Sequence, residues 1–245
     1  MVWWVMRRLF IDESLSGQVV RRMDVAGVGY HPAKAESRSF DDQCAVCSRL
    51  AAYLADIREH YPQYHARPVA PFGDPAARLL IVGLAPGFHG ANATGRPFTG
   101  DHAGTLLYQT LYDFGFANRP HSTAACDGLE LIDCRITNAV KCLPPQNKPT
   151  GEEINNCNSY LANELGLLPD GAVVLALGSI AHKAVLKALN LKIKEYPFKH
   201  AGEFAIFDGC LLSSYHCSRY NTQTGRLTPK MFQQVIARAR KLLNG

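Results

Sequence analysis

The sequence predicts an α/β fold: a single three-layer α/β/α domain built on a mostly parallel, four-stranded sheet. Short apolar runs that indicate buried strands alternate along the chain with amphipathic segments that indicate helices, and this alternation is typical of parallel sheets with helices on both faces. The chain has 245 residues, 47% of them apolar, which is enough for a substantial core. We expect the domain to span residues 41–245, after an irregular N-terminal extension over residues 1–40.

Four strands are expected. The first three are the apolar runs ARLLIVGLAPG (77–87), CRITNAV (134–140) and AVVLALG (172–178). A hairpin-like region over 204–216, with FAIF and CLLSSYH, supplies the fourth. Ligands of such sheets bind beyond the carboxyl ends of the strands, so the polar segments that follow these runs are the candidate functional segments.

The helices expected between and after these strands are marked by apolar residues at helical spacing and by capping residues. In chain order they are a helix over 44–61, one opened by Asp101, one with a capping box from Thr150 and Glu153 that runs to about Leu165, one capped by Ser179, and a last one begun by Thr228 and Pro229. A proline-rich connection, Pro62 to Pro75, follows the first helix.

Composition narrows the class of protein only slightly. A formal net charge of +5 suits a polyanionic partner, although many other proteins are equally basic. The start MVWWVMRRLF lacks the features of a signal peptide. No apolar run reaches the roughly 20 residues of a membrane span. We therefore expect no membrane association and a cytoplasmic location.

A glycine-rich loop follows the first strand, GLAPGFHGANATGRPFTGD from Gly83 to Asp101. Glycines let a backbone approach a ligand closely and turn amides toward it. The loop has neither the Gly-Lys-Ser/Thr of a P-loop nor a GxGxxG pattern. By itself it is equally consistent with an ordinary loop and with a ligand-binding loop.

Two further segments carry polar groups after strands. In ITNAVKC, Asn138 offers a donor and an acceptor suited to a ring edge that carries both N–H and C=O groups, or else it caps a turn. In SSYHCSRYNTQTGRLT, His216 lies beside basic and aromatic residues, an arrangement suited to stabilising a leaving anion near a nucleic-acid backbone, or else it is a surface histidine.

Four of the eight cysteines have a spacing that suits a metal site. Cys44-x-x-Cys47 with Cys142 and Cys157 gives four thiolates, enough for zinc or for a four-iron cluster. The count alone does not separate the two. The others, Cys126, Cys134, Cys210 and Cys217, show no ligand spacing and fit unreactive thiols.

Taken in order, the three segments GLAPGFHGANATGRPFTGD, ITNAVKCLPPQNKPTGEE and SYHCSRYNTQTGRLT resemble the family 5 uracil-DNA glycosylases, from about Cys44 to the C-terminus. The resemblance implies a three-layer glycosylase fold and a 4Fe-4S cluster on the four cysteines. It also implies a monofunctional N-glycosyl hydrolase of base excision repair, acting on uracil and on other deaminated bases (hypoxanthine, xanthine). Two positions depart from the family pattern: Cys217 replaces a usual proline, and Ala93 replaces a frequent arginine.

The resemblance also assigns roles within the reaction. His216 is expected to donate a hydrogen bond to the departing base, and Asn138 to face the base that stacks on Phe98. Ala85 stands where related families carry an acid, so we expect Asn92 to position the attacking water. The base site is expected to comprise Gly83, Ala85, Gly87, Phe98 and Asn138.

The expected partner is uracil-containing DNA, single- or double-stranded, bound by a monomer. Its contacts are assigned to the segment that follows His216, namely Arg219, Tyr220, Asn221 and Arg226. The alternatives are a non-catalytic iron–sulfur or zinc DNA-binding module, an electron carrier and a zinc hydrolase. Convergent polar segments favour an enzyme over a module or a carrier, and no His/Asp/Glu ligand set suggests the hydrolase.

Overall fold

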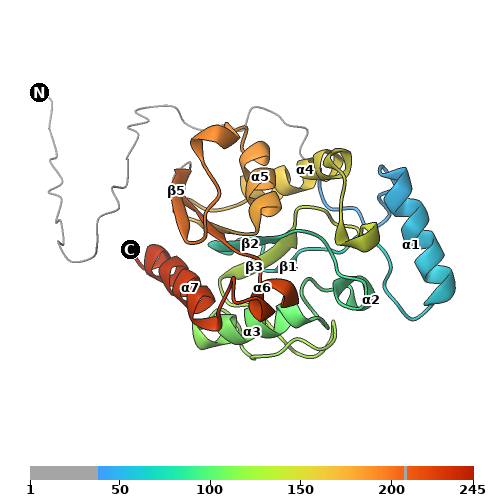
Figure 1. Cartoon of the computed structure of the whole chain (residues 1–245), viewed down its shortest axis with the longest axis horizontal. Helices are drawn as coiled ribbons and strands as arrows, with labels where there is room; N and C mark the ends of the chain where they lie inside the picture. The colour runs from blue at the N-terminus through green and yellow to red at the C-terminus, as the bar shows by residue number, and fades with distance from the viewer. Residues whose placement is uncertain (1–37, 207–208) are drawn as a thin grey trace, which may run out of the picture.

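A computed structural model describes residues 38–206 and 209–245, so residues 1–37 of the predicted N-terminal extension lie outside the described part of the chain (Figure 1). The helices and strands are, in order, α1 (Ser48–His60), β1 (Phe72–Gly73), β2 (Leu79–Gly83), α2 (Ala91–Thr94), α3 (His102–Asp113), β3 (Cys134–Asn138), α4 (Gly151–Gly166), β4 (Val173–Leu177), α5 (Ser179–Ala188), β5 (Gly202–Ile206), β6 (Gly209–Ser214), α6 (Arg219–Gln223) and α7 (Pro229–Leu243). Short 3-10 turns occur at Pro145–Asn147 and Ile193–Glu195.

The strands form one sheet in the order β1-β3-β2-β4-β6-β5. Its four inner strands, β3-β2-β4-β6, are parallel, and β1 and β5 pair antiparallel at the two edges. The α/β class and the parallel core are confirmed, but the predicted count of four strands is wrong because the described residues form a six-stranded sheet. The two-residue β1 lies in the proline-rich connection, too short to give a pattern, and β5 is the first arm of the predicted hairpin region.

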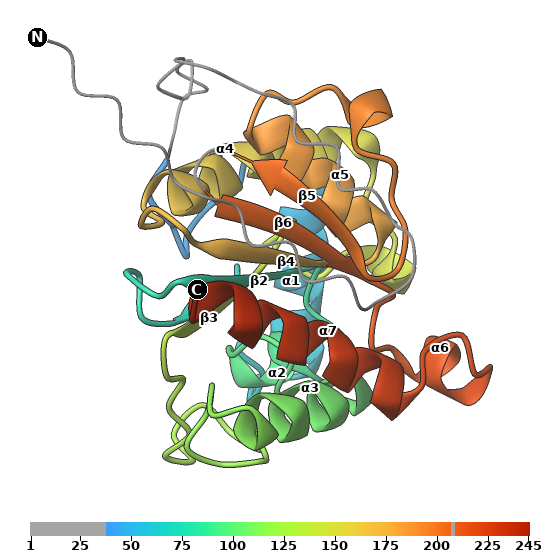
Figure 2. The same ribbon diagram turned by 90° about the vertical axis from the view of Figure 1, so that its left-hand side faces the viewer.

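Helices cover both faces of the sheet (Figure 2). Leu79 and Ile81 of β2 pack in one cluster with residues of α3 and α7. Leu80 and Val82, which point to the other face because side chains alternate along a strand, pack in a second cluster with α4 and α5. The buried residues of α1 form a third cluster with Cys142 and Cys157. The predicted three-layer arrangement is therefore confirmed.

Most helix ends agree with the predicted caps. Asp101 accepts a hydrogen bond from Gly104 N, Thr150 forms a capping box with Glu153, and Thr228 caps α7. The predicted cap at Ser179 is wrong: Gly178 precedes α5 with φ of 94°, and Ser179 is its first helical residue. The helix predicted over 44–61 begins only at Ser48. None of the described helices is long and apolar enough to cross a membrane.

A buried ion pair ties β3 to α4. The Lys141 ammonium, three residues past β3, lies 2.6 Å from Glu164 Oε1 and also donates to Thr137 Oγ1. Both side chains are almost completely buried. Glu164 Oε2 accepts no hydrogen bond from the described residues, and Arg135 Nε lies 3.7 Å from it. Two buried charges are stable here because each compensates the other.

We expect Lys141→Met to reduce the free energy of unfolding by about 3 kcal/mol, since it leaves the Glu164 charge buried without its closest partner. The double variant Lys141→Met/Glu164→Leu should recover most of that loss, because two apolar side chains replace the pair. Chemical denaturation of both variants measures the difference. A double variant less stable than the single one would contradict this account.

Candidate active site

The carboxyl ends of the parallel strands bring the three predicted motifs together. Gly83 at the end of β2 pairs in register with Asn138 at the end of β3. β4 joins β2 to β6, which ends at Ser214, shortly before His216. Strand order therefore places the glycine-rich loop, Asn138 and the His216 segment together at the carboxyl ends of the inner strands.

Phe98 closes over Gly83 and Asn138. A Cβ on Gly83 would lie 2.3 Å from Asn138 Oδ1 and 2.7 Å from Phe98 Cζ, so only glycine fits there. Asn138 Oδ1 is buried and accepts no hydrogen bond from the described residues. Leaving a buried polar atom unpaired costs about 1–3 kcal/mol. An aromatic ring and an amide oxygen therefore lie side by side here, and a bound hydrogen-bond donor would satisfy that oxygen.

The backbone around Phe98 is held in a conformation uncommon for a side chain of its size. Its φ is +55°, in the left-handed region that non-glycine residues rarely adopt. Its carbonyl oxygen lies against Gly104, where a Cβ would come within 1.7 Å, and Tyr108 donates to the preceding Pro97 carbonyl at 2.6 Å. Phe98 as a whole is only 6% exposed. These contacts fix the aromatic surface of the pocket.

His216 stacks against Phe98. The two ring centroids lie 5.8 Å apart with an interplanar angle of 25°. Burial lowers the pKa of His216, and the nearby Asp101 carboxylate only partly opposes that shift. The His216 carbonyl accepts a hydrogen bond from Asn221 Nδ2 at 2.9 Å. The imidazole is therefore neutral near pH 7, fixed in position, and still able to donate through its N–H.

Asn92, which follows Gly87 in the glycine-rich loop, carries a second buried amide with unpaired atoms. It lies on the short helix α2, is 0% exposed, and neither its Oδ1 nor its Nδ2 has a hydrogen-bond partner among the described residues. Its backbone is anchored to Gly87 O and to Ala66 N. Both functional groups of this amide are thus available to an ordered water or a ligand.

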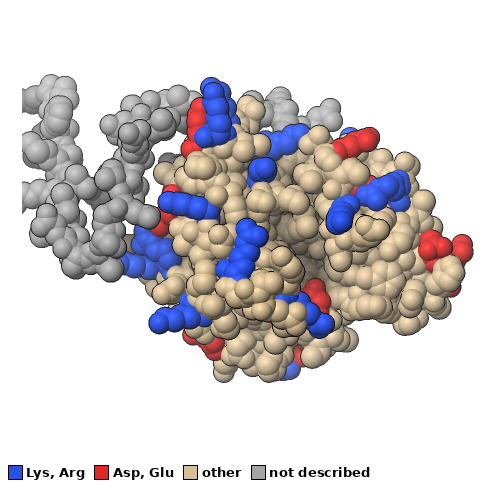
Figure 3. Space-filling model, in the orientation of Figure 1, with Lys and Arg blue, Asp and Glu red and all other residues tan. Residues whose placement is uncertain are grey.

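An open groove of about 830 Å³ runs beside the pocket. Its lining includes Gly87, His89, Asp101, His121 and Arg219, which come from the glycine-rich loop, the α3 start, the loop before β3 and α6. Basic side chains are scattered over the face drawn in Figure 3, which is hollowed near its centre. Ala85 does not line this groove and packs against the α1 cluster instead.

The predicted DNA contacts occupy different places. Arg219 lines the groove, and Tyr220, which is 71% exposed, projects from the surface. Asn221 supports the His216 carbonyl, and the Arg226 guanidinium lies 4.6 Å from the centre of the Tyr215 ring. Arg219, Tyr220 and Asn221 lie on the short helix α6, whose cap Ser218 accepts a hydrogen bond from Asn221 N.

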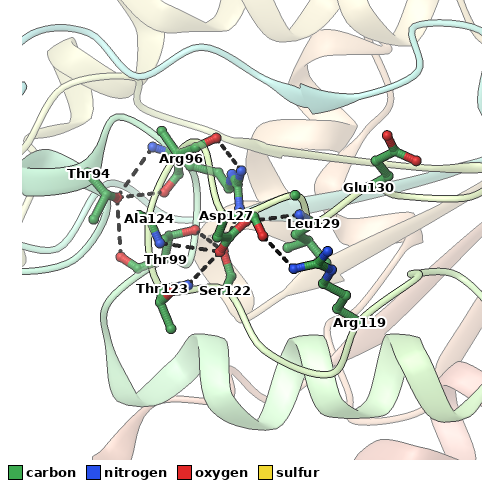
Figure 4. A network of polar contacts seen from close by, with 12 residues as sticks. Thr94, Arg96, Thr99, Arg119, Ser122, Thr123, Ala124, Asp127, Leu129 and Glu130 are labelled. Atoms are coloured by element: carbon green, nitrogen blue, oxygen red, sulfur yellow. Dashed lines mark hydrogen bonds and ion pairs between the residues drawn. The ribbon is translucent and has the colours of Figure 1, made fainter.

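A buried arginine network supports the pocket from behind (Figure 4). Arg96 Nη1 donates to Asp127 Oδ1 at 2.7 Å and to Ser122 Oγ at 3.0 Å, and Nη2 donates to the Ala125 carbonyl. Ser122 Oγ is 2.5 Å from Thr99 Oγ1, next to Phe98. The network thus joins the loop before β3 to the segment that carries the Phe98 ring.

Burial by itself would raise the pKa of Asp127, but hydrogen bonds from Arg96 and from three backbone amides outweigh it and lower that pKa. Sequence reasoning missed this network. Arg96 stands within the glycine-rich motif, but nothing in the sequence shows that its partner lies about thirty residues away in an irregular loop. Asp101 was recognised only as a helix start.

The four cysteines predicted as ligands line one small cavity between α1, α4 and the loop after β3. Its lining consists of Cys44, Cys47, Cys142 and Cys157 with Val46, Ala51, Asn156 and Tyr160. All four thiols are free of disulfides, and burial raises the pKa of Cys157 to about 11. Among the remaining cysteines, Cys134 and Cys217 are buried in the main core and Cys126 is exposed.

The described residues contain no group of three or more His, Cys, Asp or Glu side chains placed to hold a single metal ion. A zinc ion would need its sulfur ligands about 2.3 Å away, which draws four sulfurs close together. An iron–sulfur cluster is bound by four thiolates around a larger core. Four thiols that line one cavity are the donor set of both kinds of site.

Comparison with known proteins gives consistent results. Residues 70–240 match the family model described as the uracil DNA glycosylase superfamily. The type-5 uracil-DNA glycosylase of Thermus thermophilus is 47% identical over 205 residues, covering 81% of this chain and 93% of that protein. The type-5 enzyme of Pyrobaculum aerophilum is 45% identical over 201 residues, covering 80% and 87%. That of Mycobacterium leprae is 40% identical over 208 residues, covering 81% and 91%.

We expect Arg96→Met to reduce the free energy of unfolding at pH 7 by about 3 kcal/mol, because it leaves the Asp127 carboxylate largely buried without its cation. The pKa of Asp127 is lower in the folded protein than in the unfolded chain, so its ionised form stabilises the fold above about pH 4. This stabilisation is lost as the pH falls through the folded-state pKa of Asp127. The difference in free energy of unfolding between wild type and Arg96→Met should therefore become smaller toward acid pH. Arg119→Met, which removes an exposed cation from the same loop, should cost under about 1 kcal/mol; equal losses would contradict this account.

Proposed function

The chain belongs to the uracil DNA glycosylase superfamily and is a uracil-DNA glycosylase of DNA repair, and we propose that it excises the base in the pocket formed by Gly83, Phe98, Asn138 and His216. The observation that supports this assignment is the meeting of three groups at one sheet edge. They are a fixed aromatic ring, a buried amide oxygen without a partner, and a neutral imidazole. The relatives favour an enzyme over a non-catalytic DNA-binding module.

The base enters this pocket after leaving the duplex. A base inside the stack is out of reach, so the nucleotide is rotated out, at a cost of a few kcal/mol that is smallest at a mismatch. The base stacks on Phe98, and Asn138 Oδ1 accepts its ring N–H. The backbone of Gly83, Ala85 and Gly87 forms the remaining wall.

Bond cleavage requires stabilisation of opposite charges. As the C1′–N bond breaks, its electron pair departs with the base and positive charge develops on the sugar. His216 donates a hydrogen bond to the base anion. Its neutral state suits this role, because burial lowers the pKa of His216 while the ring keeps one N–H donor. A positioned donor of this kind contributes about 3 kcal/mol.

Asn92 positions the attacking water. Ala85 leaves the pocket without a carboxylate at the place where related families carry one, and both amide groups of Asn92 are buried and unpartnered. The water oxygen forms the new bond to C1′ and releases its proton to solvent. A cation-like sugar needs only a weak nucleophile, so an amide that orders the water is sufficient.

Recognition through one amide and one aromatic ring also allows other bases. Hypoxanthine and xanthine present a ring N–H beside a carbonyl, as uracil does, and stack on the same ring. We extend the substrate range to these deaminated purines, in single- or double-stranded DNA. The protein acts as a monomer on chromosomal DNA in the cytoplasm.

DNA contacts follow the groove and α6. Arg219 lies in the groove and binds backbone phosphate, and Arg226 adds a second cation nearby. The exposed Tyr220 projects where it can fill the gap left by the extruded nucleotide. Asn221 acts indirectly, since its amide holds the His216 carbonyl.

Cys44, Cys47, Cys142 and Cys157 hold a 4Fe-4S cluster. When bound, such a cluster cross-links distant segments as a structural metal does. The residues fit because the four thiols line one cavity, where Asn156 Nδ2 approaches Cys47 Sγ at 3.5 Å and Lys141 N approaches Cys157 Sγ at 3.4 Å. The cluster ties α1 to α4 and to the end of β3, close to Asn138.

The roles of His216 and Asn138 are separable by substrate. His216→Ala should lower single-turnover excision about 100-fold on uracil, hypoxanthine and xanthine alike, because every base leaves as an anion. Asn138→Ala should depend on the base and lower uracil excision more than purine excision, because the bases differ in ring shape and the larger purines stack more extensively. Both variants should still bind abasic DNA, since phosphate contacts supply most of that affinity. Equal loss on all bases for Asn138→Ala with little effect of His216→Ala would reverse the two assignments.

The cluster assignment predicts a selective response to cysteine substitution. Cys157→Ser should lower the iron and sulfide content per chain and the melting temperature together, because cluster binding contributes to folding. Cys210→Ser serves as the matched control, since Cys210 lies in β6 away from the thiol cavity, and it should keep full iron. Loss of iron in the control but not in Cys157→Ser would refute the assignment.

A further inference from the structure

Aromatic side chains from two segments meet beside the groove, next to the end of α1. Tyr61 and Tyr64 belong to the turn that follows α1, and Phe88 and His89 belong to the glycine-rich loop. The ring centroid of Tyr61 lies 5.0 Å from that of Tyr64 and 5.3 Å from that of Phe88. The centroids of Phe88 and His89 are 4.7 Å apart. These four residues are called the aromatic surface below.

The aromatic surface is packed on one side and open on the other. Tyr64 and Phe88 pack against the third core cluster, which contains the buried residues of α1. Phe88 and His89 line the groove. His89 is exposed, and Tyr61 is 36% exposed. Aromatic side chains that stay exposed beside a groove mark a binding surface, and this one is continuous with the groove that we propose to accept DNA.

The aromatic surface is held in place by hydrogen bonds between its two segments. Ala66 N, at the end of the turn that begins with Tyr61, donates to Asn92 O at 2.9 Å. The Tyr64 hydroxyl and His89 Nδ1 are hydrogen-bonded at 2.8 Å. The rings are therefore ordered before a ligand arrives, which reduces the entropy that binding costs.

Charge at this turn is balanced. The Arg58 guanidinium donates to the Ala66 carbonyl at 2.6 Å, and Arg67 follows directly and is exposed. Asp56 and Glu59, both exposed on α1, oppose these two cations. Attraction of phosphates is therefore weak here, and the affinity of the aromatic surface for DNA must come mainly from its rings.

Stacking on such rings favours unpaired bases. In a duplex both faces of a base are covered by its neighbours, whereas a base of a single strand can lie on an aromatic side chain. This contact tolerates any base, because every base has a π-face. The pocket formed by Gly83, Phe98, Asn138 and His216 is proposed to recognise the lesion itself. A sequence-tolerant surface beside the groove therefore suits the nucleotides that flank the lesion.

We propose that the aromatic surface binds unpaired bases of the strand that flanks the lesion, and that it gives single-stranded DNA a contact that duplex DNA lacks. The exposed rings of Tyr61 and His89 stack on the bases, and Tyr64 and Phe88 hold those rings in place. This inference rests on the proposed function and specifies which form of DNA the aromatic surface serves.

Tyr61→Ala tests the inference, because it removes an exposed ring outside the pocket. Its affinity for a single-stranded oligonucleotide with an abasic site should fall about ten-fold, the size of effect that loss of one stacking ring has. Its affinity for the same site in a duplex should be unchanged, and so should single-turnover excision of uracil at saturating DNA. Tyr61→Trp keeps a ring and should restore the affinity for the single strand.

Tyr112→Ala is the matched control, since Tyr112 is 46% exposed on α3 and does not line the groove; it should leave both affinities unaltered. The inference would be overturned if wild-type protein did not bind the single strand, or if Tyr61→Ala bound it as tightly as wild type, as it would if the aromatic surface served a protein partner. An equal loss on duplex DNA, or a loss that Tyr61→Trp does not reverse, would also overturn it. Absence of uracil excision by the wild-type protein would instead refute the proposed function.

Discussion

The parallel pairing of β2 with β3 on one side and β4 on the other is the interaction on which the rest of the structure depends. It sets Gly83 beside Asn138, and through β4 it brings the end of β6 and His216 to the same edge. Every residue of these inner strands is buried except Arg135 of β3 and the first two residues of β6, so a shift in register would expose apolar side chains and scatter the site at the same time. The strand register therefore determines both the stability of the sheet and the geometry of the pocket.

The pocket keeps several unfavourable features that the surrounding contacts must offset. Phe98 adopts a left-handed backbone conformation, and the amides of Asn92 and Asn138 are buried with unpaired atoms. Features of this kind each cost on the order of 1–3 kcal/mol and persist where the neighbouring structure determines them. The Arg96–Asp127 network on one side and the Lys141–Glu164 pair on the other supply that support. These ion pairs hold the surrounding segments in place, so the unpaired amide atoms remain available to a substrate.

Sequence alone predicted those features whose signal is local or carried by a contiguous motif. Apolar runs at 77–87 and 172–178 located inner strands, and Thr150 with Glu153 located a helix start. The edge strand Phe72–Gly73 is too short to show any periodicity. Ser179 has the side chain of a typical cap, but Gly178, with its positive φ, is the residue that caps α5. Arg96 and Asp127 could not be paired from sequence, because their contact is set by how an irregular loop folds back. Local patterns predict helices and strands, whereas contacts that support a site from behind, such as Arg96 with Asp127, depend on tertiary packing.

The proposed contacts with the base require no acid at Ala85. The groups that we propose to contact the base are all neutral: an amide at Asn138, an imidazole at His216 whose pKa is lowered by burial, and the Phe98 ring. None of them must change its protonation state before the bond breaks, so a range of bases with different leaving-group acidity can be accommodated. Base contacts that stay neutral throughout the reaction are therefore in keeping with the broad base specificity proposed above.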